Sequence, residues 1–157
     1  MNRNSPSQRL VRGAVAGAVA TAPMTAVMFA AQKLGFMGRQ PPAKITDAAL
    51  DQLEVDGSRL QRDLLAAAAH VGFGAAAGAL FGLLRRRRTR GARAAAEGAT
   101  FGTAVWVTSY AGWVPAFGIM PPPSRDRAGR PSAMLVAHWV FGTALGLVLG
   151  RLRRPRR

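Results

Sequence analysis

Four stretches of this sequence are apolar, long and almost free of charge, and this pattern restricts the chain to very few folds. They are residues 13–31, 64–84, 94–118 and 133–150, and Glu97 is the only charged residue within them. About 20 helical residues cross a hydrocarbon core of roughly 30 Å, so each stretch is long enough to span a membrane. We therefore predict an all-α polytopic membrane protein with four transmembrane helices.

The segments between and beyond these stretches predict the domain organisation. Residues 13–150 form a single membrane domain, with a basic N-terminus at 1–12 and a basic tail at 151–157. A short surface helix is expected at about 45–55, because Ile45, Ala49 and Leu53 share one helical face there. It should lie on the extracytoplasmic side and cap the bundle.

The arginines predict the orientation of the spans. Of the 22 basic residues, 14 fall in three segments that four spans would place on one side: Arg3, Arg9, Arg12, Arg85, Arg86, Arg87, Arg88, Arg90, Arg93, Arg151, Arg153, Arg154, Arg156 and Arg157. Basic connections stay in the cytoplasm, so both termini are expected there, in a bacterial inner membrane. The alternative for residues 13–31 is a cleaved signal peptide, although 19 residues exceed the usual length of its apolar region.

The second and fourth stretches share a sequence pattern at an offset of 68 residues. His70, Phe73, Gly74, Ala76, Gly78 and Gly82 recur as His138, Phe141, Gly142, Ala144, Gly146 and Gly150. Gly13, Ala14 and Gly17 recur more weakly as Gly98, Ala99 and Gly102, and each odd stretch is followed by a Gly-x-Met turn. The pattern predicts a duplicated helical hairpin.

Two glycine stripes follow from this repeat, Gly74, Gly78 and Gly82 in one helix and Gly142, Gly146 and Gly150 in the other. Residues four apart stay on one helical face, and glycine lets two membrane helices approach closely, as in a glycine zipper. The stripes favour packing of residues 64–84 and 133–150 within the chain. The alternative is a homo-oligomer or a membrane-protein partner held through a stripe.

The two histidines are the most informative polar residues. Each precedes its stripe by four residues, so His70 and His138 should lie at matched depth in the outer half of the membrane. Tyr110 and Thr25 occupy equivalent places in the odd spans, which predicts an intramembrane polar cluster of all four residues. Structural hydrogen bonding is the simplest role for the histidines. A proton or small-solute pathway, and axial ligation of a haem or a metal, are the alternatives.

Composition and motifs exclude several function classes. The chain has no cysteine, which excludes disulfides, thiolate metal sites and a cysteine nucleophile. It has no hydrolase, zinc-protease or phosphate-loop motif, so we expect no enzymatic activity, no metal and no resident cofactor. Arg93 is placed to pair with Glu97 one helical turn later. The arginine cluster between the spans favours membrane lipid as a partner, and it lacks the motifs of a nucleic-acid interface.

The sequence resembles the YagU-like group of small bacterial inner-membrane proteins. The resemblance rests on the following residues: Gly17, Ala20-Thr21-Ala22-Pro23-Met24, Pro41-Pro42, Ile45-Thr46, His70-x-x-Phe73-Gly74, Trp113-Val-Pro115, Gly118 and His138-x-x-Phe141-Gly142. It implies four spans and an inner-membrane location, and it brings no catalytic residues. We expect a structural or accessory bundle protein, and the alternative is a pathway or a haem module centred on His70 and His138.

Overall fold

The computed structural model describes residues 5–85 and 89–152, and within these ranges the chain is helical and contains no strand. The elements in chain order are α1 (Pro6–Lys33), α2 (Pro41–Gln52), α3 (Arg59–Leu84), α4 (Gly91–Thr108), the π-helical turn η1 (Ser109–Trp113), α5 (Val114–Ala116), the 3-10 turn η2 (Pro123–Arg125) and α6 (Arg130–Leu152). The expectation of an all-α protein is confirmed.

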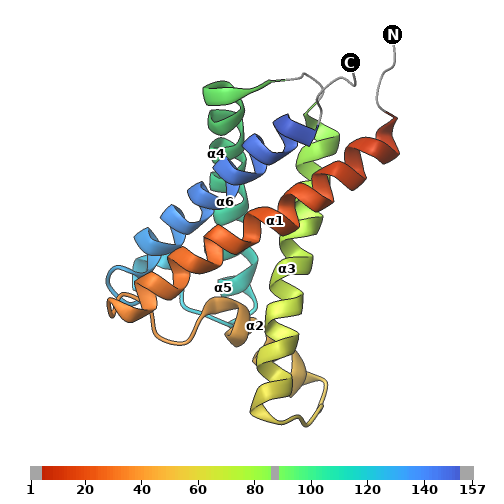
Figure 1. The fold of residues 1–157 in the computed structure, drawn as a ribbon. Coiled ribbons are helices and arrows are strands. Elements are labelled where there is room, and N and C mark those ends of the chain that lie inside the picture. Colours follow the sequence, from red (N-terminus) through yellow and green to blue (C-terminus); the bar gives the residue numbers. More distant parts are fainter. Residues whose placement is uncertain (1–4, 86–88, 153–157) are drawn as a thin grey trace.

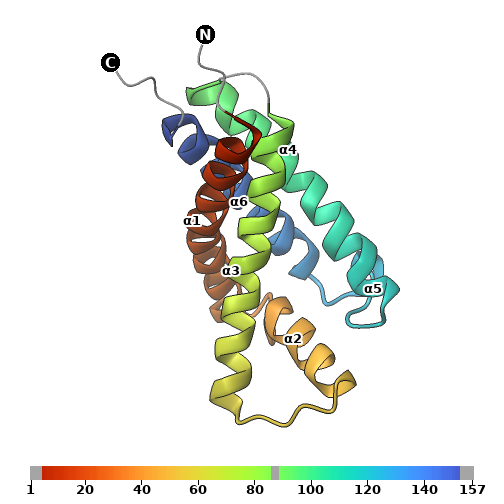
Figure 2. The same ribbon diagram turned by 90° about the vertical axis from the view of Figure 1, so that its right-hand side faces the viewer.

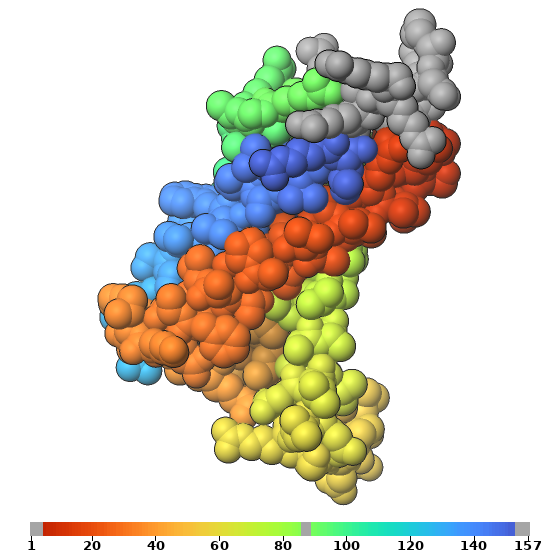
Figure 3. Space-filling view, in the orientation of Figure 1, coloured from red at the N-terminus to blue at the C-terminus, as the bar shows by residue number. Residues whose placement is uncertain are grey.

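The long helices form two antiparallel pairs. Helix α1 packs along α3 and α4 packs along α6, and the two pairs join where α1 lies against α6 (Figure 1). Figure 3 shows α1 and α6 side by side on one face of the molecule. The first turns of α3 extend past the end of α1 in the same view. The short helix α2 packs against α3. The fold is thus a pair of hairpins with α2 added to the first.

Close backbone contacts hold α1 against α3. A methyl group built onto Gly78 would overlap the backbone of Gly13 and Gly17, and one built onto Gly74 would overlap Thr21. A methyl group built onto Gly82 would likewise overlap the carbonyl oxygen of Arg9. Side chains larger than hydrogen would push the two helices apart, so these glycines set the separation of the first hairpin.

The second hairpin is packed in the same way. Methyl groups built onto Gly98 and Gly142 would each overlap the backbone of the other residue, and Gly146 lies against the backbone of Ala94. Gly150 is less tightly packed, since its nearest contact would be the Thr89 carbonyl oxygen at 3.2 Å. Each stripe therefore packs against the preceding long helix of its own hairpin. Both stripes thus pack within the chain, and the partner of each stripe belongs to the same hairpin.

The order of the helices places the chain's connections at two opposite ends of the bundle. The first turns of α1 and α4 and the last turns of α3 and α6 lie at one end, which we call the terminal end (Figure 1). The other two connections and α2 lie at the opposite end, which we call the loop end. Of the arginines used to predict orientation, Arg3, Arg86, Arg87, Arg88, Arg153, Arg154, Arg156 and Arg157 lie outside the described residues.

Within the described residues, three helices are long and apolar enough to cross a membrane, namely α1, α3 and α6. They contain the first, second and fourth predicted stretches. Helix α4, with 18 residues before η1 begins, is not among the three, because Arg93 and Glu97 lower its mean hydropathy. The helical path nevertheless continues through η1 and α5 over residues 91–116.

The predicted surface helix is present, but it is shifted toward the N-terminus. It begins at Pro41 and ends at Gln52, whereas we expected residues 45–55. Pro41 and Pro42 occupy its first turn, where the missing N–H groups need no partner. Helix α3 then begins with a capping box, in which the Ser58 hydroxyl accepts from the Gln61 N–H and the Gln61 side chain accepts from the Ser58 N–H.

Candidate functional site

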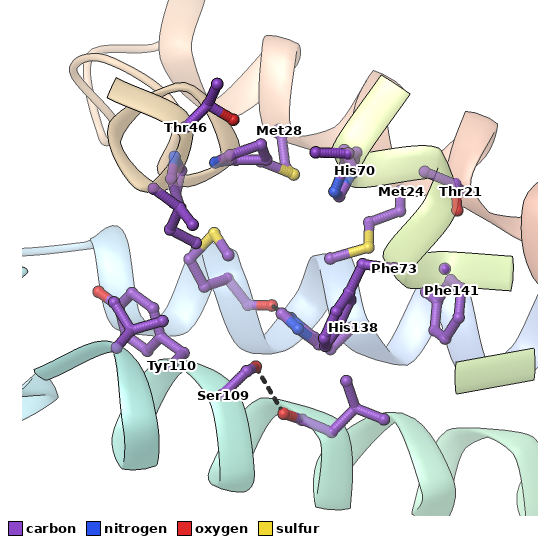
Figure 4. Close-up of a pocket in the computed structure, with 18 of the residues that line it drawn as sticks. Thr21, Met24, Met28, Thr46, His70, Phe73, Ser109, Tyr110, His138 and Phe141 are labelled. Atoms are coloured by element: carbon purple, nitrogen blue, oxygen red, sulfur yellow. Dashed lines mark hydrogen bonds between the residues drawn. The ribbon is translucent and has the colours of Figure 1, made fainter. Parts of the chain in front are cut away.

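A cavity of about 230 Å³ lies between the two hairpins (Figure 4). Helices α1, α2, α3 and α6 and the segment from α4 to α5 all contribute to its wall. The lining residues are Thr21, Met24, Met28, Pro41, Pro42, Ile45, Thr46, Ala69, His70, Phe73, Gly74, Val105, Ser109, Tyr110, Trp113, Val114, Met134, His138 and Phe141.

The cavity exists because α3 and α4 diverge. Figure 2 shows these helices close together at the terminal end and separating toward the loop end, with α2 beside α3 in the widening space. Glycine contacts hold α3 to α1 and α4 to α6, and α1 and α6 pack together. No comparable contact closes the gap between the described parts of α3 and α4.

His138 on α6 is buried in the wall of this cavity, with 4% of its surface exposed. Its Nδ1 lies 2.7 Å from the Met134 carbonyl oxygen one turn earlier. A carbonyl oxygen only accepts hydrogen bonds, so Nδ1 carries a proton and donates it. This bond fixes the orientation of the ring and leaves Nε2 as its remaining nitrogen.

His70 on α3 enters the cavity from the opposite wall (Figure 4). Its Nε2 is buried and makes no hydrogen bond to the described part of the chain. A buried polar atom without a partner costs free energy, so such an atom in a cavity wall marks a place where a bound molecule could bond. The two histidines predicted at matched depth thus line one cavity from different hairpins.

Tyr110 also lines the cavity, and it is anchored by two residues that we did not select from the sequence. Its hydroxyl donates a hydrogen bond to the Asp126 carboxylate, whose other oxygen lies 2.6 Å from Nη1 of Arg130. The side chains of Asp126 and Arg130 are 1% and 8% exposed. The spacing Asp126-x-x-x-Arg130, one helical turn, was the available signal, but burial of this pair depends on the tertiary fold.

Thr25 does not join the cluster that we predicted for it. It is half-buried and donates to the Thr21 carbonyl oxygen at 2.8 Å, and Thr21 lines the cavity in its place. Equal spacing from Gly13 and Gly98 does not give equal orientation. Residues 109–113 form a π-helical turn, whereas α1 is α-helical throughout.

That π-helical turn brings two consecutive residues to the cavity wall. Both Ser109 and Tyr110 are buried and line the cavity, and the Ser109 hydroxyl donates to the Val105 carbonyl oxygen at 2.6 Å (Figure 4). Single π-turns inside helices often occur at functional sites. Pro115 lacks the N–H that would continue regular α-helical bonding here, and this proline is the signal that we did not use.

The remaining wall is apolar and uncharged. It includes the thioethers of Met24, Met28 and Met134 and the rings of Phe73 and Phe141. No lysine, arginine, aspartate or glutamate lines the cavity, and the described residues contain no group of three or more His, Cys, Asp or Glu that could hold a metal. The arrangement suits a neutral, largely apolar molecule that can bond to an imidazole.

Charged groups are instead concentrated outside the cavity. At the terminal end, Glu97 lies 2.9 Å from Nε of Arg85 and 3.4 Å from Nε of Arg93, and it accepts from the Thr89 hydroxyl at 2.6 Å. The expected Arg93–Glu97 pair is therefore confirmed. Arg85 also donates to the Gly146 carbonyl oxygen at 3.1 Å, which ties the α3–α4 connection to α6.

At the loop end, ion pairs join α2 to the first turns of α3. Arg62 lies 2.7 Å from Asp51 and 3.7 Å from Asp47, and Asp47 also pairs with Arg39 at 2.7 Å. These contacts hold α2 beside α3, where its first two turns contribute Pro41, Pro42, Ile45 and Thr46 to the cavity wall. Helix α2 thus forms one side of the cavity.

The protein-family match of this chain includes both hairpins and every residue of the cavity wall. Residues 7–157 match the model of DUF6789, a family of unknown function. No curated protein and no solved structure matches the chain significantly. The YagU-like resemblance is not tested by this match and stays a prediction. Because the match extends over almost the entire chain, the chain belongs to the DUF6789 family of unknown function.

Proposed function

We propose that this chain is a four-span bacterial inner-membrane protein that binds a small, neutral, largely apolar molecule in the cavity between its two hairpins. The observation that carries the proposal is the cavity itself, which His70 and His138 line together with methionine and aromatic side chains. A protein that binds such a molecule fits the small-solute alternative of the sequence analysis and does more than a purely structural or accessory protein. The proposal describes a binding protein and assigns it no enzymatic reaction.

The membrane topology in this proposal counts residues 91–116 as one span with α1, α3 and α6. These residues are continuously helical, and at about 1.5 Å per residue they are long enough to cross the hydrocarbon core. With four spans, the arginine-rich segments face the cytoplasm together with both termini. The extensive packing of α1 against α3 and α6 supports a retained first span over a cleaved signal peptide.

The proposal also includes duplication of an ancestral hairpin. Helix α1 ends in a turn with Gly35 at φ +82°, and α5 ends in the same turn with Gly118 at φ +71°. In both turns the N–H of the residue after the glycine donates to the carbonyl oxygen five positions earlier, Phe36 to Ala31 and Ile119 to Val114. Arg62 and Arg130, 68 residues apart, each pair with an aspartate near the loop end. These matches support two copies of one glycine-packed hairpin.

Binding can be tested with an apolar alcohol that carries a bromine atom, because bromine quenches tryptophan fluorescence on contact. Trp113 lines the cavity, whereas Trp139 is 46% exposed on the outside of α6 and does not line it. One variant keeps only Trp113 and a second keeps only Trp139, with phenylalanine at the other tryptophan positions. Both variants are titrated with ω-bromodecanol in detergent.

We expect the quenching of Trp113 fluorescence to saturate as the alcohol concentration rises. The quenching of Trp139 should not saturate, because it reports only partition of the alcohol into the micelle. Equal, non-saturating quenching of both would refute the binding function and leave the accessory role. An absorption spectrum of the purified protein tests haem in the same cavity. A Soret band that is lost in His70→Phe and His138→Phe would replace our proposal with the haem alternative.

A further inference from the structure

The cavity holds its two imidazoles in unequal hydrogen-bonding states, and this difference selects among neutral ligands. The first constraint is charge. No charged side chain lines the cavity, so a phosphate, carboxylate or ammonium group would be buried there without a counter-charge. A charged lipid headgroup therefore does not suit this site, and the polar part of the ligand should be uncharged.

The second constraint is the ring of His138. Its Nδ1 donates to the Met134 carbonyl oxygen, and no carboxylate lines the cavity to stabilise a second proton. A buried ring without a counter-charge stays neutral, so Nε2 of His138 carries a lone pair and accepts hydrogen bonds. A ligand group that bonds to this atom has to be a donor.

The third constraint is the ring of His70. Its Nε2 makes no hydrogen bond to the described part of the chain, so no bond at this atom fixes whether it carries the proton of the ring. Its buried Nε2 can therefore carry the proton and donate it to a ligand. When Nε2 of His70 carries the proton, the ligand group that bonds to it has to be a hydrogen-bond acceptor.

The other hydroxyl groups of the cavity are already engaged. Thr21, Ser109 and Tyr110 donate to the Gly17 carbonyl, the Val105 carbonyl and the Asp126 carboxylate. Thr46 belongs to α2, apart from the two rings (Figure 4). The two imidazoles are thus the groups best placed to recognise the polar part of a ligand.

We propose that the cavity recognises a hydroxyl group at the end of an apolar skeleton, with the hydroxyl donating to Nε2 of His138 and accepting from Nε2 of His70. A hydroxyl group is both donor and acceptor, whereas a ketone, an ester carbonyl or an ether oxygen can only accept. The inference rests on the proposed binding function. It names the class of ligand as long-chain or isoprenoid alcohols and membrane hydroquinones.

The cavity wall also shows where the apolar part of such a molecule would extend. Phe73 lines the cavity and is 46% exposed, so the wall between α3 and α4 reaches the outer surface of the bundle. In the four-span arrangement that surface faces lipid. An alcohol could therefore enter sideways from the membrane and leave its chain in the gap between these helices.

The test compares ω-bromodecanol with its methyl ether, which has the same chain and an oxygen acceptor but no donor. In the variant that keeps only Trp113, we expect the alcohol to bind about five- to tenfold more tightly than the ether, the effect of one hydrogen bond. Equal saturable binding of both would overturn this inference and keep the proposed function. Failure of both to bind saturably would overturn the function itself.

Two substitutions assign the preference to the imidazoles. His138→Phe removes the acceptor and should abolish the preference for the alcohol, while the ether binds as before. His70→Phe should weaken both probes by a similar factor, because both lose the same donor. An unchanged alcohol preference in His138→Phe would contradict the assignment. Hydroquinone and isoprenoid alcohol sources are then distinguished by competition with decylhydroquinone and with farnesol.

Discussion

At the scale of single residues, the proposed recognition of a hydroxyl group depends on the protonation of His138. The Met134 carbonyl oxygen accepts from Nδ1 at 2.7 Å, and this contact defines the tautomer. We predict that ¹⁵N NMR of histidine-labelled protein shows one neutral imidazole with its proton on Nδ1, and that this signal disappears in His138→Phe. A proton on Nε2 of His138, or a doubly protonated ring, would contradict the acceptor role that we give this residue.

A second residue-scale prediction concerns Asp126. Its carboxylate is 1% exposed and pairs with the buried Arg130, so Asp126→Ala would leave a buried cation without its partner. We expect a loss of about 3 kcal/mol or more in the free energy of unfolding, measured by denaturant titration in detergent. Asp51→Ala removes a carboxylate that is 66% exposed and should cost less than about 1 kcal/mol. Equal losses would show that Asp126 contributes no more than a surface pair.

At the scale of helices, glycine contacts determine the separation within each hairpin. Gly78→Ala would place a methyl group against the backbone of Gly13 and Gly17, and rigid backbone cannot move aside at low cost. We expect a destabilisation on the order of 2 kcal/mol. Gly72 lies on the same helix with nothing within 4 Å of a built methyl group. Gly72→Ala should therefore be neutral or stabilising, by at most about 1 kcal/mol.

The same unfolding titration measures both glycine variants. A Gly78→Ala protein as stable as Gly72→Ala would mean that α1 and α3 are not in the close contact described here. Because the two substitutions add the same group to the same helix, intrinsic helix propensity cannot explain a difference between them.

The helices themselves were largely predictable, because their signals are local in the sequence. Apolar runs almost free of charge predict the long helices, and Ser58 and Gln61, three residues apart, form the capping box that begins α3. The partner of each glycine stripe was not predictable, because a stripe marks a close contact without naming the helix that makes it. The π-helical turn at Ser109 was also missed, and it altered which side chains reach the cavity.

At the scale of the molecule, the candidate site was predictable in part. The internal repeat identified His70, His138 and Tyr110 as candidates, and all three line the cavity. The roles of Asp126 and Thr21 required the tertiary structure, since Asp126 is buried against Tyr110 and Arg130, and Thr21 lies against Gly74 of α3. The cavity follows from the divergence of α3 and α4, and no local pattern records that divergence.

Topology is a whole-molecule prediction that the natural absence of cysteine makes easy to test. Gly57 and Arg90 are exposed at opposite ends of the bundle, between α2 and α3 and at the start of α4. We expect a membrane-impermeant thiol reagent to label Gly57→Cys in intact cells with a permeabilised outer membrane. Arg90→Cys should be labelled only after the inner membrane is opened. Labelling of both residues, or of Arg90→Cys alone, in intact cells would contradict the four-span arrangement.

The central claim is that a ligand occupies the cavity between the hairpins, and filling that cavity tests it most directly. Val105 lines the cavity, whereas Val107 on the same helix is 50% exposed and does not line it. The measurement is the affinity for ω-bromodecanol of Val105→Phe and Val107→Phe, each in the protein that keeps only Trp113. We predict at least tenfold weaker binding for Val105→Phe and unchanged binding for Val107→Phe. Equal affinities in the two variants would contradict it.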